Sequence, residues 1–344
     1  MRPETKRKLD RSGLSVTAMG FGGAPIGNFL KPIGEETVKA LIDRAWDAGL
    51  RMFDTAPGYG HGLSELRMGH NLRWRPRDEF VLSTKVGRVL EPAPRKDIDF
   101  APWVDAAAFK FRYDYSYDGT MRAFEGSLQR IGLEHIDIAL IHDCDVFVHG
   151  PELQKAYFKE AVEGAYKALD KLRSAGVVKA IGFGVNDTEV MLAAMRETDS
   201  DVLLCSNRYT LLEQDTLDEL LPLMAARKVS IIIGGGLNGG ILATGSVPGA
   251  KYFYAPAPEP IMARVRKMEA VCARHKVPLA AAAMQFVIAH PVVATHTPGS
   301  RTVAQLEQLL AWNDLPIPGE FWAEMTHEGL IRQDAPVPVL RAGG

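Results

Sequence analysis

Short apolar runs alternate with amphipathic stretches along most of the chain. The eight runs are rich in β-branched and aliphatic residues, which is typical of strands. They are VTAMGFGG, RMFD, EFVLSTK, IDIALIH, VVKAIGFGVN, DVLLCSN, VSIIIGGG and VVATHTPGS. Between the first two, the segment EETVKALIDRAWDAG places Val38, Leu41, Ile42 and Ala45 on one helical face. The pattern predicts eight strands, each followed by a helical segment of variable length.

The order of these elements indicates a fold class. Runs that are apolar on both faces and separated by helices indicate a parallel sheet covered on both sides. Eight such units fit a closed (β/α)8 barrel. The alternative is an open doubly wound sheet, but its usual G-x-G-x-x-G after the first strand is replaced here by GFGGAPIG. We therefore predict a single (β/α)8 barrel domain over residues 1–344, with an N-terminal hairpin in RKLDRSGLSV.

Two segments, 86–118 and 235–259, exceed ordinary connections between elements. Loops of this length are usually functional or disordered, and their aromatic residues argue against disorder. We therefore expect two ordered loops at the active site. Arg88 and Arg112 in the first are expected to be exposed, with contact to an acidic substrate as the alternative. His149 is expected to be a solvated loop residue, with contact to the substrate as the alternative. For His61, a place in the lining of the pocket is left open.

Four chemically useful side chains follow neighbouring strands. The second run ends at Asp54, Tyr59 lies five residues later, the third ends at Lys85 and the fourth at His142. Active sites of parallel barrels form at the carboxyl ends of the strands. A buried lysine is costly unless it is paired, and Asp54 offers a partner. Because a nearby ammonium lowers the pKa of a phenol, we predict that Tyr59 exchanges a proton near neutral pH.

The chain resembles the aldo-keto reductase superfamily along nearly its whole length. The resemblance is carried by FDTAPGYGHGLSE, STKVGR and LQRIGLEHIDIALIHD. It implies a (β/α)8 barrel that binds NAD(P) without a Rossmann motif, and a catalytic tetrad at Asp54, Tyr59, Lys85 and His142. In this family pattern, Tyr59 moves the proton, Lys85 held by Asp54 stabilises the phenolate, and His142 orients the substrate oxygen.

The resemblance also implies a cofactor site, although several family residues are replaced. Asn186 is retained for the carboxamide, but Val185 stands where a serine is usual. The usual glutamine of the sixth strand is Ser206, and the ring-stacking aromatic falls near Gly234. The loop HTPGSRTVAQLEQLL is implied to hold the adenosine phosphate end, through Gly299, Ser300, Arg301 and Gln305.

This last loop bears on the choice between NAD and NADP. In NADP-preferring relatives it carries a lysine and an arginine that grip the 2′-phosphate, and the matching positions here are Gly299 and Gln305. We therefore predict NAD as the preferred cofactor. The alternative is that Arg301 binds the phosphate and that both NAD and NADP are used freely.

Shorter sequence motifs indicate a particular branch of the superfamily. YDYSYDG and RYTLLEQ are most similar to the branch of D-threo-aldose 1-dehydrogenase (L-fucose dehydrogenase) and pyridoxal 4-dehydrogenase. The similarity implies an oxidoreductase that acts on a small sugar, polyol or aldehyde, and an aldose 1-dehydrogenase is the favoured activity. The alternatives are a pyridoxal 4-dehydrogenase or a general aldehyde and ketone reductase. A non-catalytic redox-sensing partner protein on the same barrel is the alternative from another class, and the intact tetrad favours the enzyme.

Composition excludes several other classes. The 344 residues are 47% hydrophobic and 24% charged with a net charge of −2, which is an ordinary globular profile. Such a charge predicts no general attraction to nucleic acid or an acidic membrane. The N-terminus MRPETKRKLDRSG has no apolar core of a secretory signal. Three scattered cysteines suit a reducing cytoplasm and give no metal-type spacing, so we predict no metal site. The oligomeric state is left open.

Overall fold

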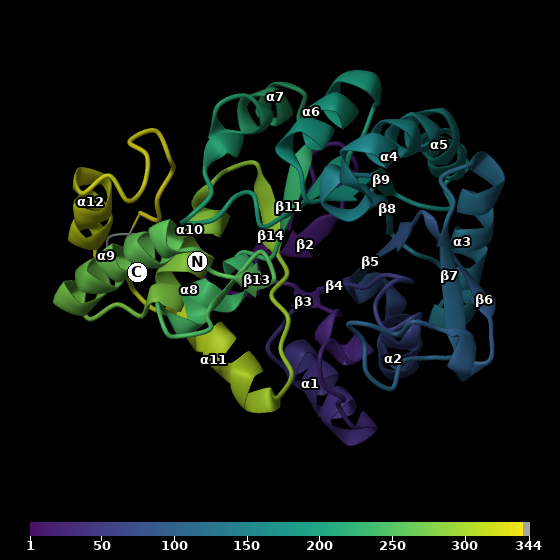
Figure 1. Cartoon of the computed structure of the whole chain (residues 1–344), viewed down its shortest axis with the longest axis horizontal. Coiled ribbons are helices and arrows are strands. Elements are labelled where there is room, and N and C mark those ends of the chain that lie inside the picture. Colours follow the sequence, from purple (N-terminus) through teal and green to yellow (C-terminus); the bar gives the residue numbers. More distant parts are fainter. Residues whose placement is uncertain (340–344) are drawn as a thin grey trace.

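Eight parallel strands form the central sheet of the protein (Figure 1). The structure is a computed structural model that describes residues 1–339. Neighbouring strands in space follow one another along the chain, apart from two short hairpins inserted between them. The strands are β3 (Phe21–Gly22), β4 (Met52–Asp54), β5 (Val81–Val86), β8 (Ile138–His142), β9 (Ala180–Val185), β10 (Val202–Ser206), β11 (Ser230–Gly234) and β14 (Val293–His296).

The sheet closes on itself where its first and last strands meet. Parallel bridges join Met19 to His296 and Gly22 to Gly299. The backbone N–H of Gly20 donates to the His296 carbonyl at 2.8 Å, and the His296 N–H donates to the Ala18 carbonyl at 3.1 Å. These bonds complete a ring of eight strands, which confirms the predicted (β/α)8 barrel. The prediction that residues 1–344 form one domain stays a prediction.

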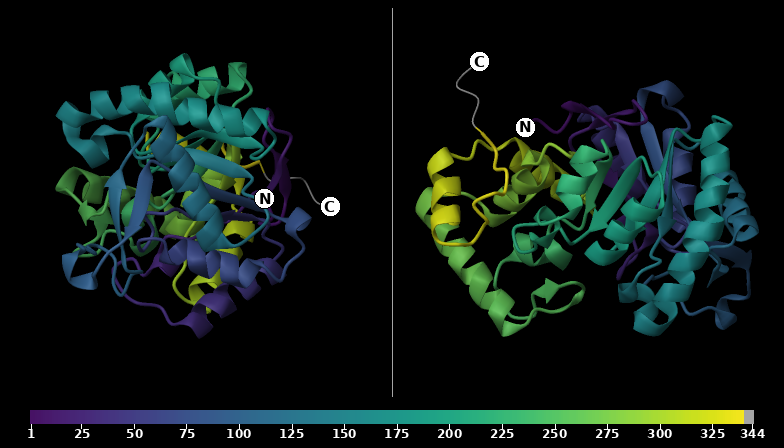
Figure 2. Two further views of the ribbon diagram at one scale, coloured as in Figure 1. Left: turned by 90° about the vertical axis from the view of Figure 1, so that its right-hand side faces the viewer. Right: turned by 90° about the horizontal axis from the view of Figure 1, so that it is seen from above.

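Helices surround the barrel and cover the outer face of its strands, as two perpendicular views show (Figure 2). The predicted face of the first helix is confirmed, since Val38, Leu41, Ile42 and Ala45 are all buried. The helices are α1 (Glu35–Asp47), α2 (Leu63–Leu72), α3 (Tyr117–Ile131), α4 (Val146–Glu160), α5 (Lys167–Ser174), α6 (Thr188–Glu197), α7 (Leu220–Ala226), α8 (Ile241–Thr244), α9 (Glu259–His275), α10 (Leu279–Ala289), α11 (Val303–Asp314) and α12 (Gly319–His327). A π-helical segment, Ala161–Tyr166, joins α4 to α5.

An N-terminal hairpin seals the end of the barrel where the strands begin. Its strands are β1 (Lys6–Lys8) and β2 (Ser15–Thr17), which pair antiparallel as predicted. Leu9, Leu14 and Val16 share an apolar cluster with residues of the barrel interior, among them Ile138 and Ile232. The hairpin therefore fills one end of the barrel and leaves the other end for chemistry.

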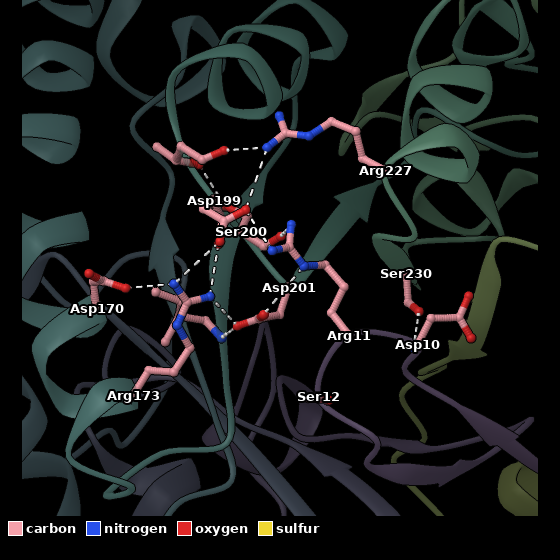
Figure 3. A network of polar contacts seen from close by, with 12 residues as sticks. Asp10, Arg11, Ser12, Asp170, Arg173, Asp199, Ser200, Asp201, Arg227 and Ser230 are labelled. Atoms are coloured by element: carbon pink, nitrogen blue, oxygen red, sulfur yellow. Dashed lines mark hydrogen bonds and ion pairs between the residues drawn. The ribbon is translucent and has the colours of Figure 1, made fainter.

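A polar network ties this hairpin to the strand beginnings (Figure 3). Asp201 stands just before β10, and its Oδ2 accepts hydrogen bonds from the Ile181 N–H at 3.0 Å and from Arg173 Nη1 at 2.8 Å. Arg11, in the turn of the hairpin, lies 2.6 Å from Asp199. The network joins the hairpin, α5 and two neighbouring strands at the end opposite the carboxyl termini of the strands.

Both long segments are ordered and each contains a hairpin. In the first, β6 (Arg88–Pro92) pairs antiparallel with β7 (Phe109–Tyr113). In the second, β12 (Lys251–Tyr252) pairs antiparallel with β13 (Ala255–Pro256). Both segments leave carboxyl ends of barrel strands, β5 and β11, and so stand over the predicted site.

Candidate active site

A buried ion pair lies at the ends of β4 and β5. The Lys85 ammonium donates to both carboxylate oxygens of Asp54 at 2.8 Å and to the Thr55 carbonyl at 2.8 Å. Lys85 is fully buried and Asp54 is 3% exposed. All three ammonium protons have acceptors, so the desolvation cost of the buried charge is offset. The predicted Asp54–Lys85 pair is confirmed.

Tyr59 lies above this pair, in the turn that follows β4. The Lys85 ammonium is 5.2 Å from the centre of the Tyr59 ring. The ring also meets His142, with 5.9 Å between the two ring centres and an interplanar angle of 78°. The four side chains predicted from adjacent strands therefore come together at one place.

A glycine pair allows the Tyr59 turn to pack against the loop after β3. A Cβ on Gly60 would lie 2.2 Å from the Gly27 carbonyl oxygen, and one on Gly27 would lie 2.7 Å from the Tyr59 carbonyl carbon. Gly60 also has a φ of 66°, which favours glycine. The two backbones can approach this closely only without side chains, and the approach fixes the base of Tyr59.

The protonation state of Tyr59 differs from the prediction. Burial raises the pKa of its phenol well above the usual value, and the carboxylates of Asp54 and Asp143 act in the same direction. Arg88 lowers this pKa, but its effect is smaller. The expectation of a lowered pKa is therefore wrong for this structure, because desolvation of the phenolate outweighs the effect of the Arg88 cation. Near neutral pH, Tyr59 is a neutral phenol and a ready proton donor.

His142 ends β8 and is 8% exposed. Burial lowers the pKa of its imidazole well below the usual value, Asp143 opposes that shift, and Arg88 and Lys85 add to it. His142 is therefore neutral near pH 7. Its Nδ1 lies 2.9 Å from Arg88 Nη1, and its Nε2 lies 3.4 Å from Asp143 Oδ2.

Arg88 is buried against the site, so the expectation of a surface residue is wrong. The residue is 8% exposed, and its Nη2 donates to Asp143 Oδ2 at 2.7 Å and to the Tyr113 hydroxyl at 3.3 Å. Arg112 of the same hairpin is exposed as expected, with 42% of its side chain accessible. The available signal was Gly87, since a glycine directly after a strand indicates a sharp change of direction.

Aromatic rings form a rim above Tyr59. Trp103, from the first long segment, lies 5.8 Å from Tyr59 and 5.3 Å from Phe29 between ring centres. Tyr254, at the tip of the β12–β13 hairpin, lies 6.0 Å from Phe29 and 6.4 Å from Phe147. We call these four residues, Phe29, Trp103, Phe147 and Tyr254, the aromatic rim. Both long segments thus contribute to the mouth of the site, as predicted.

His149 and His61, the two other histidines weighed as pocket residues from the sequence, support the first long segment. His149 Nε2 lies 3.1 Å from the Tyr115 hydroxyl, and its ring centre is 4.4 Å from those of Tyr113 and Tyr157. The expectation of a solvated residue is therefore wrong. His61 is 1% exposed and its Nδ1 lies 2.7 Å from the Phe109 carbonyl oxygen, so it holds β7 rather than lining the pocket.

The predicted nicotinamide contacts lie at the ends of β9, β10 and β11. The Asn186 side-chain amide donates to Asp145 at 3.0 Å and to Asp143 at 3.2 Å, which leaves its Oδ1 as an acceptor. The Ser206 hydroxyl accepts from Asn207 Nδ2 at 2.9 Å. Gly234 ends β11 and is followed by Gly235 and Gly236, so no aromatic side chain stands at this position.

The loop after β14 holds the remaining predicted cofactor residues. A Cβ on Gly299 would lie 2.6 Å from the Pro25 ring, so this approach requires glycine. The Ser300 hydroxyl is buried without a hydrogen-bond partner. Arg301 donates to the carbonyls of Phe29 at 2.6 Å and Lys31 at 2.7 Å, while its backbone N–H donates to Gln305 Oε1 at 2.8 Å.

Residues 1–339 contain neither a metal-binding cluster nor a membrane-spanning helix. No group of three or more His, Cys, Asp or Glu side chains in this range is arranged to hold a metal ion. None of the helices in this range combines the length and apolar character required to cross a membrane.

Comparison with known proteins identifies the class. A model of the Aldo/keto reductase family matches residues 18–327, so the chain belongs to that family. It is 39% identical over 340 residues to a pyridoxal 4-dehydrogenase of Microbacterium luteolum, covering 96% of this chain and 99% of the relative. It is 37% identical over 328 residues to a D-threo-aldose 1-dehydrogenase of a Pseudomonas species, covering 93% and 96% respectively.

Solved structures agree on the fold. A holo aldo-keto reductase from Bacillus halodurans superposes with a TM-score of 0.74 at 22% identity, covering 98% of both chains. The glycerol dehydrogenase of Gluconobacter oxydans gives a TM-score of 0.70 at 19% identity, covering both chains fully, at 100%. The family predicted from the sequence is confirmed, and the protein is an oxidoreductase enzyme of this family.

Proposed function

We propose that the protein is an NAD-dependent aldose 1-dehydrogenase of the L-fucose or D-threo-aldose type, with Asp54, Tyr59, Lys85 and His142 as its catalytic tetrad. The observation that carries the chemistry is the buried Lys85–Asp54 pair beneath Tyr59, with His142 facing the same ring. The relative at 37% identity, named D-threo-aldose 1-dehydrogenase, supports the substrate class.

Each residue of the tetrad has a definite task in this proposal. In the oxidation direction Tyr59 acts as the phenolate, which the Lys85 ammonium stabilises, and it accepts the hydroxyl proton of the substrate. In the reduction direction the neutral Tyr59 gives the same proton to the carbonyl oxygen. His142 donates a hydrogen bond that fixes this oxygen. When bound, a nicotinamide cofactor would accept or supply the hydride.

The residues at the strand ends fit such a cofactor. Asn186 Oδ1 is an acceptor suited to a carboxamide N–H, and Ser206 adds a hydroxyl beside it. The glycines from Gly234 onward leave room for a flat ring, and the buried Ser300 hydroxyl lacks a partner that a phosphate oxygen would supply. The proposed cofactor set is completed by Gly299, Arg301 and Gln305.

The loop after β14 supports NAD over NADP. Gly299 and Gln305 are uncharged, and the Arg301 guanidinium is already bonded to backbone carbonyls of the loop after β3. A charge-assisted hydrogen bond contributes roughly 1.5–3 kcal/mol, so the lack of a ready cation removes the advantage of a 2′-phosphate. The contacts of Arg301 therefore argue against the role of substitute phosphate ligand.

The cofactor proposal is tested by measuring kcat/KM with NAD⁺ and NADP⁺ on one substrate. We expect the parent enzyme to favour NAD⁺, and Gln305→Arg to narrow the preference by roughly tenfold, which corresponds to about 1.4 kcal/mol. Arg301→Ala should leave the preference unchanged. A tenfold preference for NADP⁺ in the parent that Arg301→Ala abolishes would show that Arg301 binds the 2′-phosphate and would contradict the proposed NAD preference.

A second substrate has its own support. The aromatic rim would stack on a planar ring, which favours an aromatic aldehyde such as pyridoxal. The relative at 39% identity is named pyridoxal 4-dehydrogenase. Steady-state assays with NAD⁺ and either L-fucose or pyridoxal separate the two candidates by kcat/KM. A broad screen of sugars and aldehydes covers a general reductase, and absence of turnover in it would favour a redox-sensing protein.

The same proposal covers the domain organisation and the cellular compartment of the enzyme. We place the whole chain, residues 1–344, in a single barrel domain that acts on a small-molecule substrate in the cytoplasm. The three cysteines within the described residues are all free and buried, which suits a reducing compartment.

A further inference from the structure

We infer that Arg88, together with Asp143, is a positioning unit for His142 that holds the imidazole in the Nε2–H tautomer required to bind the substrate oxygen. The inference rests on the proposed function for its catalytic meaning. Its structural content, the tautomer of one buried histidine, can be measured without any substrate.

The tautomer follows from the chemistry of the two contacting groups. A guanidinium carries only hydrogen-bond donors, so the 2.9 Å contact between Arg88 Nη1 and His142 Nδ1 requires Nδ1 to be the acceptor. The imidazole is neutral, since burial is the largest influence on it. A neutral ring with an unprotonated Nδ1 carries its proton on Nε2. His142 therefore presents Nε2–H as its donor.

Asp143 orients Arg88 and would compete for His142 without it. The Asp143 Oδ2 lies 2.7 Å from Arg88 Nη2 and 3.4 Å from His142 Nε2. The short ion pair with the guanidinium occupies this carboxylate oxygen, so Asp143 competes less for the Nε2–H that a substrate would accept. Asp143 has a φ of 52°, an uncommon backbone conformation for a residue other than glycine, of the kind that clusters at functional sites.

The first long segment delivers Arg88 to this position. Gly87 has a φ of 101°, and a Cβ there would lie 2.4 Å from the Tyr115 ring, so the chain turns inward only with glycine. The Arg88 guanidinium then lies over the Tyr113 and Phe111 rings, 4.9 and 5.5 Å from their centres. Backbone turn, aromatic packing and ion pair thus fix the guanidinium from three sides.

The test is the ¹⁵N NMR spectrum of the His142 ring in the full-length protein, recorded for the parent and for Arg88→Met. We expect a pure Nε2–H tautomer in the parent, and a mixture of tautomers or a protonated ring in the variant. Arg112→Met is the matched control, since Arg112 lies on the same hairpin but is exposed. Its spectrum should equal that of the parent.

Kinetics give the second readout. Arg88→Met should lower kcat by roughly 10- to 100-fold with KM changed less, and Arg88→Lys should recover part of the loss because it restores one donor and the charge. If Arg88→Met does not fold, the spectrum of the parent alone decides, because an Nδ1–H tautomer or a doubly protonated His142 ring in the parent overturns the inference.

The two proposals fail in different ways. An unchanged His142 spectrum in folded Arg88→Met overturns the positioning role, even for an enzyme that turns over L-fucose. The expected change of tautomer, in a protein that oxidises none of the screened substrates, supports the positioning role and removes the proposed function.

Discussion

Tyr59 carries the proton that the proposed reaction moves. Replacing it by phenylalanine keeps the ring that packs against Trp103 and His142 and removes only the hydroxyl. Loss of a general acid–base typically costs 10²–10⁴-fold, so we expect Tyr59→Phe to lose most turnover while its melting temperature and cofactor affinity stay near those of the parent. Turnover within about threefold of the parent would show that another group carries the proton.

The raised pKa of Tyr59 predicts how the two reaction directions depend on pH. Oxidation needs the phenolate, whose fraction grows about tenfold per pH unit below the pKa, so kcat/KM for oxidation should rise steadily above neutral pH. Reduction needs the phenol, which is already the dominant form, so its rate should be nearly flat from pH 6 to 8. Rates in both directions across this range, measured at constant ionic strength, check the assignment.

A substitution of Lys85 tests the same pH dependence of oxidation. Lys85→Met removes the ammonium 5.2 Å from the Tyr59 ring, which makes the phenolate harder to form. The oxidation profile should therefore shift to still higher pH. A profile identical to that of the parent would contradict the proposed role of Lys85. Because the change leaves Asp54 buried without its cation, the melting temperature of the variant must be measured alongside its kinetics.

At the scale of elements, the barrel separates stability from chemistry between the two ends of its strands. The beginnings of β9 and β10 are joined by Asp201, which accepts from the Ile181 N–H and from Arg173 (Figure 3). Their other ends carry Asn186 and Ser206, which belong to the proposed cofactor site. The same strand thus serves a structural network at one end and the proposed site at the other.

This division predicts that Asp201→Ala lowers stability without changing the reaction. Asp201 is 5% exposed, and its loss leaves the buried Ile181 N–H without its acceptor and removes one acceptor of the Arg173 guanidinium, at a cost of about 1–3 kcal/mol. The melting temperature should fall, while kcat at 25 °C stays within about twofold of the parent. Asp170→Ala is the control, because this partner of Arg173 is 42% exposed and exposed pairs contribute little. A large loss of kcat in folded Asp201→Ala would contradict the separation.

At the scale of the whole molecule, closure of the barrel determines which residues meet. Asp54, Lys85 and His142 lie at the carboxyl ends of three successive strands of the ring, and β4, β5 and β8 pair in parallel. Met19 and Gly22 join the first strand region to the last, which brings the loop after β14 beside the loop after β3. Arg301 can reach the Phe29 and Lys31 carbonyls only because of this closure.

The sequence by itself determined the elements and the main chemical groups. Apolar runs and the helical face of Val38, Leu41 and Ile42 follow from local periodicity, so the eight strands and the first helix could be predicted from it. Asp54, Lys85 and His142 could be found because each directly ends a run, and the carboxyl ends of parallel strands share one face. The pairing of Lys85 followed from the cost of burying a charge.

Only the tertiary structure decided the state and surroundings of those groups. The pKa of Tyr59 depends on how much water the two long segments exclude, and Arg88 is buried because Gly87, Tyr113 and Asp143 converge on it from distant parts of the chain. His149 likewise finds its partners only when α4 packs on β7. Desolvation and long-range pairing depend on three-dimensional packing, which local sequence patterns do not contain.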